Sequence, residues 1–399
     1  MEGFRKTKYL FLGVFPVLLA CVEIFEPETI TFESAIVIEA TITNELKQHE
    51  VKLSRSYAFE ADGPEVVRNA EVAVLDDQGG EYLFEESAPG TYLSRDSFAA
   101  QEGRSYRLQV TANGRTYGSA SSELTPQAQM DAVYAERLTN AEGVEGVAIR
   151  VDASSPSENA RNYRYTFEEG YKIIAPRWSP FTLIPDPQSP CGMIKVAKEV
   201  ENRVCYNTEA SRSIVLTNTN DLAQDRVSGF IIRFIDRDNY IISHRYSILV
   251  RQLVQSDAAY SFFETLESFS GSESLFSETQ PGFLEGNVFA EGEAAEKVLG
   301  YFDVASVSER RIFFNYDDLF PGEPLPPYAD PCRLNAIPLI SDGIPPVCVL
   351  RPLVELNIVS FFKENAGELE GGPFLTSPFE CGDCTALGET AVPEFWTEE

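Results

Sequence analysis

Histidine is nearly missing from this chain of 399 residues, which contains only His49 and His244. A Ser-His-Asp triad needs a histidine to carry its proton, and general acid-base catalysis near neutral pH most often uses one. A metal site with several histidine ligands needs more of them than the chain holds. The shortage argues against histidine-dependent chemistry, and we expect neither an enzymatic activity nor a cofactor.

Basic residues are also scarce, with 32 Lys and Arg against 62 Asp and Glu and a formal net charge of −30. A protein that binds nucleic acid needs a basic surface to replace the counterions of the phosphates. Nucleic acid is therefore not an expected partner. The acidity suits a soluble exported domain, and it could attract cations or basic surfaces.

The apolar run at the amino terminus, Tyr9–Leu19, is shorter than the roughly 20 residues that a membrane-spanning helix needs. It follows three basic residues, and Ala20 and Cys21 come directly after it. A cationic start, a short apolar core and a small residue before the cut are typical of a secretory signal peptide. We predict a lipoprotein signal over residues 1–20, lipidation of Cys21 by acyl chains such as palmitate, and a tether over 21–33. An ordinary signal peptide or a transmembrane anchor is the alternative.

The other six cysteines suit disulfides, because an even number in an exported protein favours pairing. Six cysteines allow 15 pairings. We expect Cys191 to pair with Cys205 because the loop between them is short, and the remaining four to pair among themselves. Cys381 and Cys384 also have the spacing of a redox dithiol or of half a zinc site. The candidates are Cys191, Cys205, Cys332, Cys348, Cys381 and Cys384.

Aromatic residues are plentiful, with 27 Phe and 17 Tyr, and this composition favours strands. From residue 34 to 126, short alternating segments are separated by turn signals, and Asn113-Gly114 between two of them predicts a hairpin. The number and spacing of these segments predict an immunoglobulin-like β-sandwich.

A larger β-rich domain with disulfide-stapled loops is predicted over residues 127–399. Tyr240–Leu253 is expected to form one long strand. About one helix is expected; it should begin near Ser256-Asp257, because apolar residues then recur at helical spacing. The predicted fold class is therefore mainly β.

Two sets of side chains are candidates for binding. Asp236, Asp238 and Asn239 lie in a tight turn and offer oxygen ligands for calcium, although the glycine and distal glutamate of an EF-hand are missing; a polar hairpin turn is the alternative. Trp178 and Trp396 could stack on sugar rings, but buried packing is the default for such side chains. A pair of acids for glycoside hydrolysis cannot be singled out among 62.

The order of several segments resembles the domain of unknown function 4249 (DUF4249) lipoproteins of Bacteroidota, over nearly the whole mature chain. Acidic residues after Cys21 also resemble a surface-export signal of that phylum. The segments that carry the family resemblance are Ile36–Thr43, Val51–Ser56, Ala70–Val72, Pro89–Tyr92, Arg245–Gln252, Gln280–Val288, Val298–Phe302, Cys381–Thr385 and Pro393–Trp396.

The resemblance implies an outer-membrane lipoprotein on the cell-surface side of the membrane, in a family with no established activity. Members are often encoded beside TonB-dependent receptors, which implies an accessory role in transport by ligand capture or as a lid. A structural or adhesive component of another outer-membrane assembly is the alternative, followed by a hydrolase that uses carboxylates.

Overall fold

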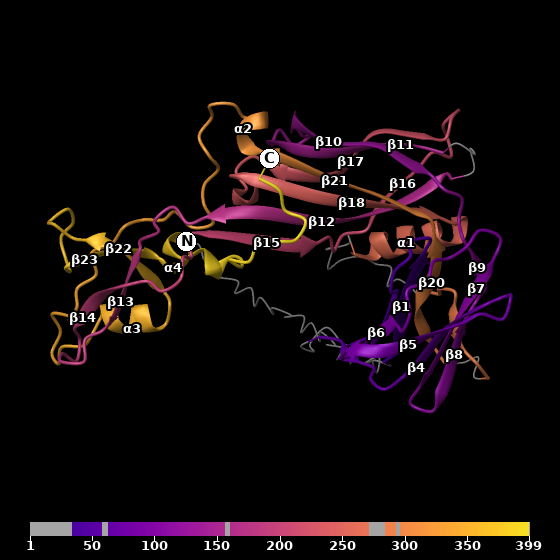
Figure 1. Cartoon of the computed structure of the whole chain (residues 1–399), viewed down its shortest axis with the longest axis horizontal. Helices are drawn as coiled ribbons and strands as arrows, with labels where there is room; N and C mark the ends of the chain where they lie inside the picture. Colours follow the sequence, from indigo (N-terminus) through magenta and orange to yellow (C-terminus); the bar gives the residue numbers. More distant parts are fainter. Residues whose placement is uncertain (1–33, 58–62, 156–159, 271–283, 293–295, 399) are drawn as a thin grey trace, which may run out of the picture.

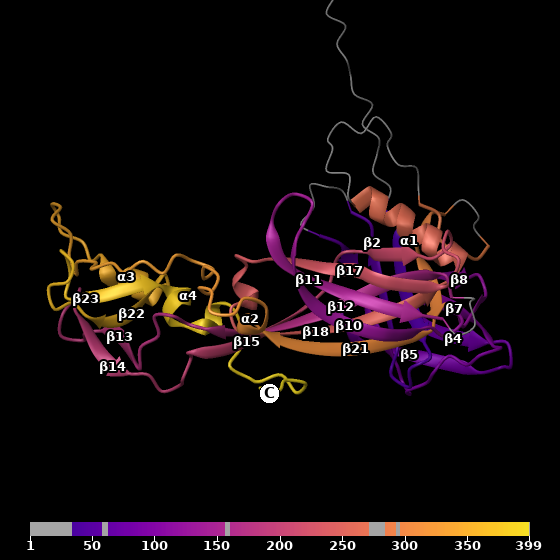
Figure 2. The same cartoon turned by 90° about the horizontal axis from the view of Figure 1, so that it is seen from above.

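The computed structural model describes residues 34–57, 63–155, 160–270, 284–292 and 296–398. The described chain is mainly β, as predicted, and its elements form three bodies in a row. An N-terminal sheet lies at one end, two longer sheets form the middle, and a small disulfide-braced module projects from the other end (Figures 1 and 2).

The N-terminal sheet has 11 strands, and its main path runs in the order β19-β8-β7-β4-β5-β6-β2-β1-β20, with β3 beside β2 and β9 beside β7. Several of its strands alternate between buried and more exposed residues; in β7 the buried residues are Tyr106, Leu108, Val110 and Ala112. The strands are β1 (Ile36–Thr43), β2 (Glu50–Arg55), β3 (Glu65–Val66), β4 (Glu71–Asp76), β5 (Glu81–Ala88), β6 (Thr91–Ser94), β7 (Ser105–Ala112), β8 (Arg115–Ser119), β9 (Ser122–Glu123), β19 (Val288–Ala290) and β20 (Val298–Ala305).

Two strands of this sheet come from far beyond residue 126, where the first domain was predicted to end. β20 pairs in parallel with β1, and β19 pairs with β8. The Asn287 side chain makes two hydrogen bonds with the Phe302 backbone. These bonds connect the start of β19 to β20, the two strands at the ends of the main path. A parallel partner requires a long crossover, which local sequence patterns do not reveal. The hairpin at Asn113-Gly114 joins β7 to β8 as expected, whereas the immunoglobulin-like topology stays a prediction.

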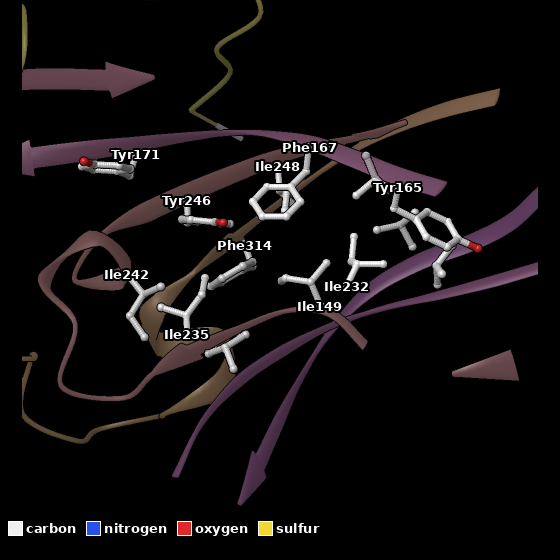
Figure 3. Packing of buried hydrophobic residues seen from close by; sticks show 14 of the residues in the cluster. Ile149, Tyr165, Phe167, Tyr171, Ile232, Ile235, Ile242, Tyr246, Ile248 and Phe314 are labelled. Atoms are coloured by element: carbon white, nitrogen blue, oxygen red, sulfur yellow. The ribbon is translucent and has the colours of Figure 1, made fainter. Parts of the chain in front are cut away.

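The middle body packs a three-stranded sheet, in the order β10-β11-β17, on a five-stranded sheet that runs β15-β12-β18-β21, with β16 beside β12. Figure 3 shows Ile149 and Ile232 of the first sheet facing Phe167, Ile248 and other apolar side chains of the second. The strands are β10 (Gln129–Thr139), β11 (Glu145–Ser154), β12 (Asn162–Ile174), β15 (Val204–Ala210), β16 (Val215–Asn218), β17 (Arg226–Asp236), β18 (Arg245–Gln255) and β21 (Val307–Asn315).

The strand expected over Tyr240–Leu253 begins later, at Arg245, because its first residues form the 3-10 helix η1 (Tyr240–Ile242). The Asn239 side chain accepts a hydrogen bond from the Ile241 amide at 3.2 Å and so caps this turn. Ile241 and Ile242 are buried in the core, which fixes the turn in place.

The expected helix is confirmed as α1 (Asp257–Ser270), which lies where the N-terminal sheet meets the middle body (Figure 1). Its buried Phe262 packs on Tyr301 of β20, with ring centroids 5.1 Å apart. In the described part of the chain, the other α-helices have six residues or fewer: α2 (Tyr316–Leu319), α3 (Leu350–Glu355) and α4 (Phe379–Gly382).

The third body, called the tip below, consists of residues 180–200 and 332–384. Two segments far apart in the sequence therefore build it together. It has a small core of its own in which Leu183, Met193, Leu350 and Phe361 are buried. The tip contains β13 (Phe181–Pro185), β14 (Met193–Ala197), α3, β22 (Val359–Glu364), β23 (Phe374–Pro378), α4 and η2 (Cys384–Ala386), the last of which continues past residue 384.

Candidate functional site

Three disulfides brace the tip and its attachment to the middle body. Cys191 bonds to Cys348, Cys205 to Cys384, and Cys332 to Cys381. The expected pairing of Cys191 with Cys205 is therefore wrong, and only Cys332 and Cys381 pair within the last third of the chain. Loop-closure entropy grows slowly with loop length, so packing, and not sequence distance, decides which cysteines meet.

Cys381 and Cys384 bond to different partners and so do not form a dithiol with each other. Both are fully buried, and a side chain at Gly382 between them would collide with Ser360. The Cys-Gly-Asp-Cys segment is thus a point where two disulfides meet in a tightly packed turn.

Loss of the Cys205–Cys384 bond is expected to destabilise the protein strongly, because the bond joins β15 to η2 across 179 residues of sequence. The double substitution Cys205→Ser with Cys384→Ser should lower the free energy of unfolding by about 2–5 kcal/mol. Urea denaturation of both proteins would measure this difference. A loss below about 0.5 kcal/mol would show that the bond is dispensable for the fold.

Exposed apolar side chains gather on the tip. Ten of the 21 large apolar side chains that are exposed among the described residues belong to it, although it is the smallest body. The most exposed is Ile344, whose side chain is fully open to solvent. Large exposed apolar surfaces on a folded protein mark sites of interaction. The ten residues are Phe181, Ile184, Ile194, Val200, Ile340, Ile344, Val347, Leu356, Ile358 and Leu369.

The tip carries charged side chains of both signs and is acidic, like the whole chain. Residues 180–200 and 332–384 carry five Lys or Arg and nine Asp or Glu, a net charge of −4 in a chain whose net charge is −30. Ion pairs such as Lys195 with Glu364, and Arg351 with Glu355 at 3.1 Å, lie among the exposed apolar residues. An apolar centre with a polar rim is the usual composition of a protein–protein interface.

A buried ion pair joins the N-terminal sheet to the middle body. Asp303 of β20 is 2% exposed and accepts a hydrogen bond from Gln255 at 2.9 Å. The Arg164 guanidinium lies 3.5 Å from the same carboxylate and 4.1 Å from the ring centroid of Phe263. Burial raises the pKa of the Asp303 carboxyl, and the neighbouring Arg164 opposes that rise. This network fixes the two bodies relative to each other.

The two histidines lie in different bodies and have structural surroundings. His49 precedes β2 and is buried; its Nε2 hydrogen-bonds to the Phe98 carbonyl at 2.9 Å. His244 precedes β18 and is half-buried. Burial lowers the pKa of both rings.

The lowered pKa of His49 predicts a loss of stability in mild acid. The unfolded chain takes up a proton near the ordinary pKa of 6.5, whereas the folded chain resists it. The His49 contribution is therefore complete above about pH 6.5 and is lost as the pH falls toward the folded-state pKa. Replacing His49 with Gln should flatten the slope of the unfolding free energy against pH below about pH 6.5. An unchanged slope would assign the pH dependence to other groups.

The remaining candidates take part in local packing and hydrogen bonding. The Trp178 indole donates to Asn202 at 2.9 Å, and Trp396 packs on Tyr206 with ring centroids 5.0 Å apart. Asp236, Asp238 and Asn239 lie in the turn before η1, where the Asn239 side chain serves as the cap. No cluster of three or more His, Cys, Asp or Glu that could hold a metal ion occurs in the residues that the structure describes.

Cys21, the predicted lipidation site, lies outside the described residues, as do residues 1–33 as a whole. Within the described ranges, none of the helices has the length and apolar character needed to cross a membrane.

A family model described as "Domain of unknown function (DUF4249)" matches residues 22–311, which include β13 and β14 of the tip but not residues 332–384. No curated protein matches the chain. Among solved structures, a DUF4785 family protein from Legionella pneumophila is 10% identical, with a TM-score of 0.17. That match covers 55% of this chain and 51% of the other, so the chain spans about half the length of that structure. A likeness at this level supports no conclusion about fold or function.

Proposed function

The chain belongs to the DUF4249 family, and on that premise we propose that it is a non-enzymatic accessory lipoprotein of the outer membrane. In this proposal Cys21 carries the lipid, and the protein lies on the cell-surface side of the membrane. The tip docks on a TonB-dependent transporter, for which the protein captures a ligand or gates the mouth of the barrel.

The concentration of exposed apolar side chains on the tip is the observation that carries this proposal. A fully exposed Ile344, with Val347 and Ile340 nearby in the sequence, is costly in water unless a partner covers it. The disulfides between Cys191 and Cys348 and between Cys332 and Cys381 hold this surface in one conformation. A preorganised surface loses less conformational entropy on binding.

β1, the first described strand after the predicted tether, belongs to the N-terminal sheet, whereas the tip projects from the far side of the middle body (Figure 1). This arrangement suits a protein that is held at one end and presents a binding surface at the other.

Affinity purification of the lipidated protein from outer membranes in mild detergent, followed by mass spectrometry, tests the proposal. We expect a TonB-dependent barrel in stoichiometric amount, and its loss when Cys21→Ser removes the anchor. Recovery of a different envelope assembly would favour a structural or adhesive role. Recovery of the protein alone would contradict both roles.

A further inference from the structure

The hairpin of β13 and β14 in the tip is a two-stranded sheet, and no third strand joins it among the described residues. Its register contains no bulge. At one end the Lys198 amide donates to the Pro180 carbonyl at 2.9 Å, and at the other the Asp186 amide donates to the Gly192 carbonyl at 2.9 Å. Because bonded and non-bonded pairs alternate in an antiparallel ladder, the even-numbered residues bond within the hairpin. The odd-numbered residues therefore direct their backbone groups away from it.

The outward residues of β14 are Met193, Lys195 and Ala197. Within the ranges that the structure describes, no other residue hydrogen-bonds to their backbone N–H or C=O groups. The Lys195 side chain does not cross this edge, because it pairs with Glu364 in the tip. β14 thus presents a row of free donors and acceptors, which is what an open sheet edge offers to another extended chain.

Two neighbouring edges in the tip are blunted or covered. On β13 the Phe181 amide donates to Ser179 Oγ at 3.3 Å, and Pro185 has no amide hydrogen to donate. Beside β23 the backbone of Asn335 exchanges two hydrogen bonds with that of Thr376. β14 is therefore the better edge of its hairpin for a further strand.

The outer face of the hairpin is apolar. Ile184 and Ile194 lie opposite each other on the two strands and are 40% and 39% exposed, and Val196 is half-buried beside them. Leu183 and Met193 on the other face pack into the core of the tip. A strand added at β14 would therefore gain apolar contacts with Ile194 and Val196 in addition to backbone hydrogen bonds.

The open edge is linked to the most exposed part of the tip. Cys191, in the turn before β14, bonds to Cys348 in the segment that carries Ile344. The Arg351 guanidinium donates to the Pro190 carbonyl in the same turn at 2.8 Å. Figure 1 shows β14 at the end of the tip that is remote from the N-terminal sheet. These bonds hold the edge in position before a partner arrives.

We propose that an extended segment of the transporter adds to β14 as a third strand of this hairpin, with apolar side chains on the side of Ile194 and Val196. In such strand addition the backbone bonds supply affinity, and the alternate side chains supply specificity. The inference deepens the docking part of the proposed function and rests on it.

A second copy of this chain fits the same edge poorly. Antiparallel pairing of two β14 strands in full overlap would place Lys195 directly opposite Lys195 of the other copy, and like charges in that position are destabilising. Two chains that each carry a net charge of −30 also repel each other. The edge therefore favours a different protein.

Ala197→Pro tests the edge, because it removes one outward amide hydrogen and leaves the bonds inside the hairpin. Ala197 is exposed, and the matched control Ala197→Val keeps the amide and suits a strand. Both variants would be purified with their lipid anchor from outer membranes in mild detergent. We expect the proline variant to recover roughly tenfold less transporter than the wild type, and the valine variant to recover as much.

Hydrogen exchange of the wild-type chain supplies a measurement that needs no variant to fold. The amides of Lys195 and Ala197 should exchange rapidly in the isolated chain and become protected in the complex with the transporter. The amides of Ile194 and Val196 bond within the hairpin and should be protected in both states. Fragmentation of the labelled peptides in the mass spectrometer gives the needed resolution of single residues.

Unchanged exchange at Lys195 and Ala197 in the complex, or equal recovery of the transporter by Ala197→Pro and the wild type, would overturn strand addition and leave docking of the tip intact. Failure of the wild type to recover a transporter would overturn both the inference and the proposed function. Protection of these amides in the isolated chain that rises with its concentration would assign the edge to a second copy and so contradict the inference.

Discussion

Replacing Asp303 with alanine is expected to lower the free energy of unfolding by about 3–5 kcal/mol, because it leaves the Arg164 guanidinium buried without its counterion. The side chains of Arg164 and Asp303 are only 15% and 3% exposed. Packing on Phe263 holds the guanidinium in place, so it cannot easily turn toward water. Gln255 loses its acceptor at the same time. Chemical denaturation followed by circular dichroism would measure the loss.

A second substitution distinguishes the cost of an unpaired buried charge from the cost of lost packing. Asp303→Ala combined with Arg164→Met removes both charges and should recover part of the stability. The matched control is Glu309→Ala, which removes one partner of the exposed pair with Arg251 and should cost less than about 1 kcal/mol. If Asp303→Ala costs no more than this control, the ion pair does not join the two bodies.

Charged substitutions on the tip are expected to abolish recovery of the membrane partner while leaving the fold intact. Ile344→Asp with Val347→Asp places two carboxylates on side chains that are 101% and 57% exposed. Burying them in an apolar interface without partners should weaken binding by about 2 kcal/mol or more, which is roughly 30-fold. Quantitative mass spectrometry of purified complexes would report the loss.

The control for the substitutions on the tip is the same kind of change, an exposed apolar residue replaced by Asp, on another body. Leu46 is 77% exposed near the start of the N-terminal sheet, and Leu46→Asp should leave partner recovery unchanged. Thermal unfolding of both variants should match the wild type, because neither changes a buried group. Equal loss of the partner in both variants would place the docking surface elsewhere.

Local patterns in the sequence predict the elements of this fold better than their arrangement. Alternation and turn signals predict the strands, and helical spacing after Ser256 predicts α1. The parallel pairing of β1 with β20 depends on residues about 260 positions apart and has no local signal. Local patterns do not predict the tip either, because its core packs Leu183 against Leu350 and Phe361 from a distant segment of the sequence.

For the candidate sites, too, the sequence predicts the residues better than it predicts their contacts. The sequence identifies all six cysteines that form disulfides, but the pairing follows from tertiary contacts such as that between β15 and η2. Asp303 is a lone acid in the apolar strand β20, and this pattern could have indicated a buried charge. Exposure of Ile344 and Val347 has no such signal, since apolar residues in sequence are expected to be buried.

Site-specific photo-crosslinking at Ile344 tests the docking of the tip most directly. A photoreactive amino acid at position 344 in the lipidated protein on intact cells should form one major crosslinked product. We predict that mass spectrometry will identify a TonB-dependent transporter in that product, and that the same probe at position 46 will give none. A product that contains a different protein, or no product at 344 while position 46 reacts, would contradict the account.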